Sequence, residues 1–224
     1  MPKRAPTRPA PRSRLEARLA EGAGRMGLNL TPAQAQQFIQ YLELLQRWGQ
    51  KINLTASLDP GAIIDHHFFD SLALWSVATP AHGDRLLDVG SGAGFPGVPL
   101  KIVAPSISLT LLEPRQKRAA FLQVVVAELG LTASRVEATR LADFSTIEPY
   151  SWIVARGVGR LAQLIEQAMP NLAPGGTIVL YASERQRIDE LQVLKDFKMT
   201  EHRYRLPFSA LERRLLLLRY PSGR

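Results

Sequence analysis

The sequence predicts an α/β fold: a mostly parallel, Rossmann-like sheet that follows a helical N-terminal cap and ends in an antiparallel hairpin. Three observations support this prediction. From about residue 83 onward, short apolar or β-branched runs alternate with helical patterns, which is typical of βαβ units. Before that point the pattern is helical only, and the last two strand-like runs have no helix between them. We therefore expect a cap over residues 15–82 and one α/β domain over residues 83–224.

In the cap, the first predicted helix has Thr31 as N-cap, Pro32 in its first turn and apolar residues at spacings of three and four until Gly49. A second helix should begin after Asp59-Pro60 and reach Trp75. The predicted strands of the sheet cover residues 85–89, 107–112, 135–138, 152–155 and 177–182, with helices over residues 115–129 and 160–172. Residues 201–206 and 214–220, separated by the turn-rich 207–209, predict the hairpin.

Composition narrows the possible functions. The chain has 224 residues and no cysteine, which excludes disulfides, thiolate metal sites and cysteine nucleophiles. No run approaches the ~18 uncharged apolar residues of a membrane span, and the start lacks a secretory apolar region. We therefore expect a cytoplasmic protein without membrane association.

The first 14 residues are rich in proline, contain five basic residues and no acidic residue, and so contribute much of the formal net charge of +8. They predict a disordered basic tail. Such a tail can attract nucleic acid or can be a solvated extension, and the sequence leaves both interpretations open.

The most informative stretch is L-L-D-V-G-S-G-A-G-F-P-G-V-P-L, residues 86–100. Counted from Gly90 it matches the D-x-G-x-G-x-G of a methyl-donor site, and counted from Gly92 it matches the dinucleotide fingerprint G-x-G-x-x-G. An acid at Asp88 suits a ligand that carries an amino group, such as S-adenosylmethionine, and would repel a pyrophosphate. Gly90, Gly92 and Gly94 are therefore predicted to contact a methyl donor.

Glu113 ends the next predicted strand, where a carboxylate can accept both hydroxyls of a ribose. Both cofactors contain a ribose, so Glu113 does not choose between them. The turn Leu172-Ala173-Pro174-Gly175-Gly176 and the terminal hairpin are typical of the seven-stranded class I methyltransferases, and no second nucleotide-binding glycine loop is present. These features favour S-adenosylmethionine as cofactor, with S-adenosylhomocysteine as product, over an NAD-dependent oxidoreductase.

The methyl acceptor is constrained by what the chain lacks. Carbon methylation of cytosine usually needs a cysteine, and amine methylation typically uses an Asn/Asp-Pro-Pro-aromatic stretch where this chain has Ala155-Arg156-Gly157-Val158. A ring nitrogen such as guanine N7 needs no general base, and Arg156 could donate to the base or its phosphate as the catalytic residue. The alternative for Arg156 is an ion pair with Asp88 or Glu113. A small-molecule methyltransferase also remains possible.

A metal site is not expected. His66 and His67 with Asp70 could imitate one, but an i, i+3 pair on one apolar helix is more simply a hydrogen-bonded structural pair.

Several segments in order make the chain similar to the RsmG (GidB) family, bacterial methyltransferases of guanine N7 in the 530 loop of 16S ribosomal RNA. They are Trp48 with Asn53-Leu54-Thr55, His67-Phe68-Phe69-Asp70-Ser71, D-V-G-S-G-A-G-F-P-G-V-P-L, Ile153-Val154-Ala155-Arg156 and Glu212-Arg213-Arg214-Leu215. The resemblance implies an RNA partner, either 16S RNA alone, the small ribosomal subunit or an assembly intermediate. We expect the protein to be a monomer.

The same resemblance implies roles for individual residues. Donor contacts would be made at Gly90, Phe95, Arg156 and the main chain of Leu141 and Ala142, with Glu113 at the ribose. We expect Phe95 to lie against the donor and its replacement by alanine to leave the fold intact.

On the RNA side, the resemblance implies roles for Asn53, His67 and Arg213. The family commonly has a Lys-Gly pair after the fifth strand, where this chain has Ala182-Ser183. Arg185 and Arg187 are the nearby candidates to replace that lysine in RNA binding.

Overall fold

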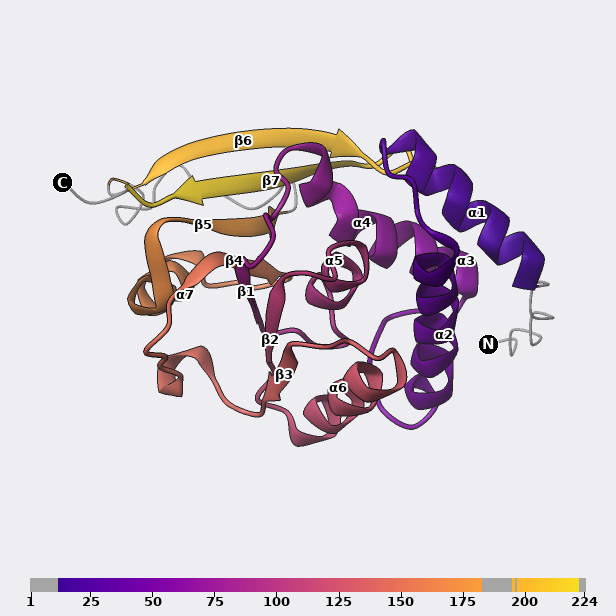
Figure 1. The fold of residues 1–224 in the computed structure, drawn as a ribbon, viewed down its shortest axis with the longest axis horizontal. Coiled ribbons are helices and arrows are strands. Elements are labelled where there is room, and N and C mark those ends of the chain that lie inside the picture. The colour runs from indigo at the N-terminus through magenta and orange to yellow at the C-terminus, as the bar shows by residue number, and fades with distance from the viewer. Residues whose placement is uncertain (1–11, 183–194, 196, 222–224) are drawn as a thin grey trace, which may run out of the picture.

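A computed structural model describes residues 12–182, 195 and 197–221, and within them the chain forms one seven-stranded sheet with helices on both faces (Figure 1). The strands are β1 (Arg85–Val89), β2 (Ser108–Leu112), β3 (Ser134–Glu137), β4 (Tyr150–Arg156), β5 (Leu172–Ala182), β6 (Lys198–Arg205) and β7 (Glu212–Arg219). Their order in the sheet is β3-β2-β1-β4-β5-β7-β6. The first five strands are parallel, and β7 runs antiparallel to both β5 and β6. The predicted α/β class and terminal hairpin are confirmed.

The longer helices are α1 (Arg12–Arg25), α2 (Pro32–Gly49), α5 (Gly97–Val103), α6 (Gln116–Glu128) and α7 (Leu161–Ala168), and the short 3-10 turns η3 (Leu141–Asp143) and η4 (Met169–Asn171) follow β3 and α7. Helix α2 begins as predicted, because the Thr31 side chain accepts a hydrogen bond from the backbone of Gln34 and the Gln34 side chain accepts one from Thr31 N–H. No helix in the described part of the chain is long and apolar enough to cross a membrane.

Two predictions about the cap are wrong. Helix α1 begins at Arg12, so residues 12–14 are helical rather than part of a disordered tail. The second predicted helix is not one regular α-helix, because α3 (Pro60–Ile63) and α4 (Phe69–Leu72) are joined by a π-helical turn, η1 (Ile64–Phe68), and followed by the 3-10 turn η2 (Ala73–Ser76). The π-helical turn contains His66 and His67, and such turns often occur at functional sites.

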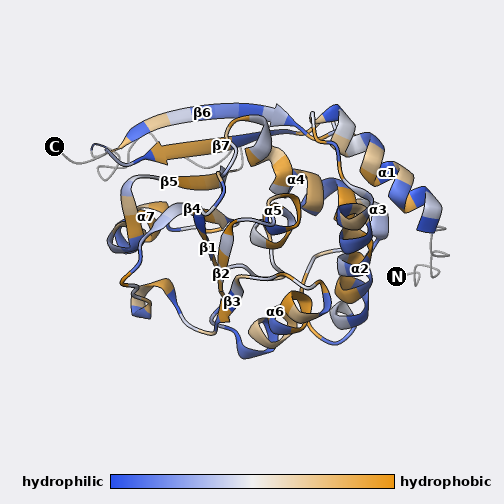
Figure 2. Ribbon diagram, viewed as in Figure 1, coloured by the Kyte–Doolittle hydropathy of each residue, from blue (hydrophilic) through white to orange (hydrophobic). Residues whose placement is uncertain are grey.

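The cap and the sheet share one hydrophobic core. Leu19 of α1 and Phe38 of α2 belong to the same buried cluster as Leu86 of β1 and Val154 of β4. Figure 2 shows hydrophobic residues concentrated on the inner strands, whereas the edge strand β6 is largely hydrophilic. A second cluster lies on the other face of the sheet, around Ile165 of α7.

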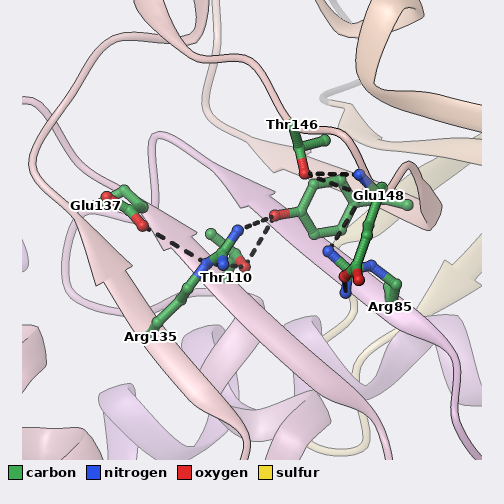
Figure 3. Close-up of polar contacts among 7 residues, drawn as sticks. Arg85, Thr110, Arg135, Glu137, Thr146 and Glu148 are labelled. Atoms are coloured by element: carbon green, nitrogen blue, oxygen red, sulfur yellow. Dashed lines mark hydrogen bonds and ion pairs between the residues drawn. The ribbon is translucent and has the colours of Figure 1, made fainter.

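The amino ends of the strands are joined by a polar network (Figure 3). Arg135 of β3 donates to Thr110 Oγ1 of β2 and to Tyr150 Oη of β4, each at 3.1 Å. Arg85 pairs with Glu148 and lies over the Tyr150 ring. These partly buried polar groups are therefore hydrogen-bonded to one another, and they link the amino ends of the strands, opposite the glycine loop.

The segment Leu172–Gly176 is part of a strand and not the turn predicted to follow the helix over residues 160–172. Helix α7 ends earlier, at Ala168, and residues 172–176 are already part of β5, where the pairing with β4 shifts register between Tyr150 and Trp152. Gly175 has φ of 75°, which accounts for a glycine at this irregularity.

Candidate functional site

The candidate site lies at the carboxyl ends of the parallel strands, between β1 and β4, where the strand order reverses. Ligands of open α/β sheets bind at this switch point. Gly90 follows β1, Glu113 follows β2, and Arg156 ends β4. Because β1 pairs with both β2 and β4, these residues come from adjacent strands.

The glycine loop supports the counting that begins at Gly90. Gly90, Gly92 and Gly94 have φ values of 69°, 60° and 99°, a region that favours glycine. A Cβ added at Gly90 would meet no atom within 4 Å, so the backbone is open to a ligand there. Gly97 is needed for another reason, because a Cβ there would lie 2.7 Å from Asp88 Oδ2.

Glu113 joins two of the elements around this open space. The residue is 4% exposed, Oε2 accepts from Gly92 N–H and Oε1 accepts from Arg115 N–H, both at 2.9 Å. Each carboxylate oxygen has a further lone pair for a ligand hydroxyl. The arrangement fits a ribose-binding carboxylate.

Asp88 lies in a different place from the one expected of a donor-binding residue. It is fully buried, and Oδ2 accepts from Gly97 N–H at 2.8 Å, at the start of α5. Burial raises the pKa of this carboxyl to about 7, although the hydrogen bond from Gly97 opposes that shift. Asp88 therefore supports the loop from beneath and is not exposed to a ligand above it.

Arg156 pairs with neither Asp88 nor Glu113, so that predicted alternative is wrong about its partner. Its Nη1 donates to Oδ2 of Asp70 at 2.9 Å, and its Nη2 is 3.0 Å from Nδ1 of His67. Both partners come from the cap, because η1 and α4 bring His67 and Asp70 to the end of β4. The hydrogen-bonded pair predicted from the i, i+3 spacing is instead joined through Arg156.

His67 is neutral at pH 7 in this arrangement. A guanidinium can only donate, so Nδ1 of His67 accepts and the ring proton is on Nε2. Burial and the nearby Arg156 charge lower the His67 pKa to about 4.

Phe95 is buried rather than exposed to the site. The His67 ring stacks on it at 4.9 Å, and the Arg156 guanidinium carbon lies 4.9 Å from its ring centre. Tyr41 and Phe68 of the cap also contact it, and only 5% of it is exposed. The expectation that alanine at this position leaves the fold intact therefore needs correction, because a large buried side chain would be lost.

A pocket of about 480 Å³ opens beside Arg156. Its walls come from the cap and from β4 to β7, and it is lined by His66, His67, Asp70, Arg156, Gly157, Val158, Gly159, Tyr181, Ala182, Tyr204 and Arg213. Among the described lining residues, two arginines face a single carboxylate and His67 is neutral, so the pocket suits an anionic or electron-rich ligand.

Sequence reasoning gave no functional role to Asp70 and Tyr204, two polar residues of this pocket. Asp70 was considered as a metal mimic or as a structural partner of the histidines and not as a partner of Arg156, although a polar residue three positions after His67 on an apolar helical segment was a usable signal. Tyr204 carried no such signal, and its hydroxyl donates to Oδ1 of Asp70 at 2.7 Å from 134 residues away in the chain.

The remaining candidates lie around the rim or outside the described residues. Asn53 is exposed, and its main-chain oxygen accepts from Arg118 at 2.7 Å near the glycine loop. Leu141 is buried and Ala142 exposed in η3, beyond β3. Arg213 lines the pocket, whereas Arg185 and Arg187 are not among the described residues. Within the described chain no three His, Cys, Asp or Glu side chains are grouped to hold a metal.

Solved structures with the same fold include methyltransferases. A methyltransferase from Pyrococcus furiosus matches with a TM-score of 0.57 at 14% identity, covering 84% of this chain and 98% of that one. TrmN from Thermus thermophilus matches with a TM-score of 0.53 at 18% identity, covering 67% of this chain and 48% of that one. At these identities the matches show the fold alone.

Sequence relatives are closer. Ribosomal RNA small subunit methyltransferase G of Chromohalobacter salexigens is 36% identical, covering 91% of this chain and 97% of the relative. The protein of the same name from Alkalilimnicola ehrlichii is 39% identical, covering 72% of each chain. The family model described as rRNA small subunit methyltransferase G matches residues 34–216, and the chain therefore belongs to the GidB family.

Proposed function

We propose that this protein transfers a methyl group from S-adenosylmethionine to N7 of a guanine in the 530 loop of 16S ribosomal RNA. The single observation that carries the proposal is the position of Arg156, which lies between the buried glycine-loop residue Phe95 and a positively charged pocket. The family name of the relatives supports an RNA of the small ribosomal subunit as the substrate.

The residues present fit the proposed methyl donor. The open side of Gly90, the Glu113 carboxylate, the main chain at Leu141 and Ala142, and Arg156 would hold it. Bound there, S-adenosylmethionine supplies an activated methyl group on its sulfonium. Asp88 does not contact the donor directly. It accepts a hydrogen bond from Gly97 N–H and so supports the loop that forms this site.

The pocket chemistry favours a ring nitrogen as the acceptor. Asp70 already accepts hydrogen bonds from Arg156 and Tyr204, and Nδ1 of His67 already accepts from Arg156. Both titratable groups bonded to Arg156 are therefore already engaged with it, which suits an acceptor that needs no general base. Guanine N7 has an exposed lone pair and no proton to remove, so transfer to it depends mainly on alignment.

On the RNA side we assign Arg213, the Nε2–H of His67 and Asn53 to substrate contacts, with Arg185 and Arg187 as further candidates. Arginine donors suit the acceptor edge of guanine and the phosphates around it. The partner is 16S RNA, free or within the small subunit or an assembly intermediate, and the protein acts as a monomer in the cytoplasm.

The decisive experiment uses cells that lack this protein. Their 16S RNA is digested and the 530-loop fragment is analysed by mass spectrometry for 7-methylguanosine. We expect the modification to be absent, restored by the wild-type gene and by Arg219→Gln at the far end of β7, and not restored by Arg156→Gln. Persistence of the modification in the deletion strain would refute the assignment and leave the small-molecule methyltransferase as the alternative.

A second measurement tests the cofactor. S-adenosylhomocysteine should raise the melting temperature of the purified protein and NAD should not, because only a ligand that binds the folded state stabilises it. Stabilisation by NAD instead would favour the oxidoreductase interpretation.

A further inference from the structure

We propose that Asp70, held by the hydroxyl of Tyr204, is a positioning residue that aims Arg156 at the reacting groups. The proposal rests on the function proposed above and assigns roles to two residues that neither the motifs nor the family resemblance had placed in the reaction. Asp70 and Tyr204 act through Arg156 and are not themselves expected to touch the methyl donor.

Asp70 is the point at which four elements of the pocket meet. Its side chain is 3% exposed and lies on α4 of the cap. Oδ2 accepts from Arg156 of β4 at 2.9 Å, and Oδ1 accepts from Tyr204 of β6 at 2.7 Å. Nε of Arg213 on β7 lies 3.4 Å from Oδ1 as an ion pair, without the geometry of a hydrogen bond.

Three contacts define the orientation of the Arg156 guanidinium. Nη1 donates to Asp70, Nη2 donates to His67, and the guanidinium carbon lies over the Phe95 ring. An arginine side chain has several rotatable bonds, so a guanidinium held by two hydrogen bonds and one ring contact loses most of its freedom before substrate arrives. Of these contacts, only the one to Asp70 joins opposite charges.

Tyr204 fixes the carboxylate in turn. With its Oδ1 occupied by the tyrosine hydroxyl, Asp70 presents Oδ2 to Arg156 in one orientation. Replacing Tyr204 by phenylalanine removes this hydrogen bond and keeps the ring and the charge of the pocket. It is therefore a mild test of positioning.

The charge of the pocket allows a positioning role of Asp70 to be distinguished from a role in attracting RNA. Among the described residues that line the pocket, Asp70 is the single carboxylate, opposite Arg156 and Arg213. Asp70→Asn makes the pocket more positive, so RNA affinity should stay the same or rise. A positioning role predicts that kcat falls about tenfold or more while KM for RNA does not increase. A rise in KM with unchanged kcat would contradict it.

The sharpest test is a double-mutant cycle on the single-turnover rate with small-subunit RNA. We expect Tyr204→Phe to lower the rate about tenfold and Arg156→Lys about a hundredfold. If Tyr204 and Asp70 act through Arg156, Tyr204→Phe in the Arg156→Lys background should change the rate less than about twofold. Multiplicative losses in the double variant would overturn the proposal.

The matched control is Tyr220→Phe, which also removes one tyrosine hydroxyl. Tyr220 packs against Phe197 beyond the end of β7 that pairs with Thr177, at the opposite edge of the sheet. Its rate should equal that of the wild type. Thermal melts of every variant identify losses that come from unfolding, and Asp70→Asn replaces Tyr204→Phe in the cycle if the latter fails to fold.

Failure of the proposed function has a different signature. If the wild type transfers no methyl to the RNA, the function fails, and the same cycle is then measured on the affinity for S-adenosylhomocysteine by calorimetry. Coupling between Tyr204→Phe and Arg156→Lys in that affinity supports the positioning role, and additive effects overturn it.

Discussion

At the scale of single residues, the hydrogen bond from Arg156 to His67 couples the position of a cation to the protonation state of a neighbouring ring. Protonation of Nδ1 would remove the acceptor that Arg156 uses and would place two like charges in contact. The lowered pKa of His67 therefore implies that acid destabilises this part of the fold.

The first prediction concerns His67→Asn, whose amide oxygen can replace Nδ1 as the acceptor but does not titrate. The pKa of His67 is lowered from 6.5 to about 4 on folding, so the unfolded state binds more protons between these values and stability falls as pH decreases through that window. From pH 7.5 to pH 5, the free energy of unfolding of the wild type should fall by about 1 to 2 kcal/mol relative to His67→Asn. Urea unfolding at both pH values measures it.

The stability of the wild type must be compared with that of His67→Asn at each pH, because titration of Asp88 changes stability with pH in the opposite direction to titration of His67. Its pKa is raised from 3.8 to about 7 on folding, so it contributes stability at low pH that is lost as pH rises toward and through 7. Both proteins retain Asp88, and its contribution cancels. A pH-independent difference between His67→Asn and the wild type would contradict the assignment of a neutral, buried His67.

Which site residues could be predicted follows from how far apart their partners lie in the chain. Gly90, Glu113 and Arg156 were identifiable because each stands where a predicted strand ends, and strand ends of a parallel sheet meet at one edge. The ion pair of Arg156 with Asp70 joins residues 86 positions apart, and no local pattern specifies it.

At the scale of elements, the glycine loop combines two different requirements within five residues. At Gly90 the left-handed backbone is open, whereas at Gly94 it is packed beneath the cap, where a Cβ would lie 2.6 Å from Tyr41 Oη and 2.8 Å from Val98 Cγ2. Tyr41 cannot yield easily, since it is fully buried and its hydroxyl donates to Ala93 O.

The second prediction compares Gly94→Ala with Gly90→Ala. Both add the cost of a left-handed alanine, about 1 kcal/mol, but only Gly94→Ala also overpacks a buried contact, for a total loss of about 2 to 4 kcal/mol. Gly90→Ala should instead weaken binding of S-adenosylhomocysteine, because its methyl group occupies the open side of the loop. Denaturant unfolding and calorimetric titration separate the two effects, and equal stability losses would show that the cap does not pack on the loop as described.

Element predictions succeeded where local pattern and tertiary packing agree. The run over residues 85–89 is buried on both faces of the sheet and coincides with β1. The π-helical turn η1 was not predictable, because apolar spacing does not distinguish its wider hydrogen-bonding ring from that of an α-helix. The Leu172–Gly176 segment failed because its glycines serve an irregular strand pairing that exists only beside β4.

At the scale of the whole molecule, the cap is part of the core and not an appendage. The aromatic rings of Phe38, Tyr41 and Phe68 contact one another or Phe95 of the glycine loop, and Trp48 contacts Phe121 of α6. Arg156 on β4 is held by cap residues as well. The boundary near residue 82 therefore marks a change from helical to alternating strand and helix patterns in the sequence, and not a division of the core.

The last prediction follows from this shared core: the cap and the sheet should unfold in one transition. Tryptophans report on both parts, because Trp48 and Trp75 lie in the cap and Trp152 lies in β4. In a variant that keeps only Trp48 and in another that keeps only Trp152, the fluorescence midpoint in urea should coincide with the midpoint from far-UV circular dichroism, as for a two-state domain. Each variant is compared with its own dichroism curve, so a stability change from the tryptophan replacements does not affect the comparison.

A Trp48 midpoint below the dichroism midpoint would show a cap that detaches first. The sheet would then have to remain folded with the loop-facing aromatic rings of the cap removed from Phe95, which the buried contacts of this structure oppose.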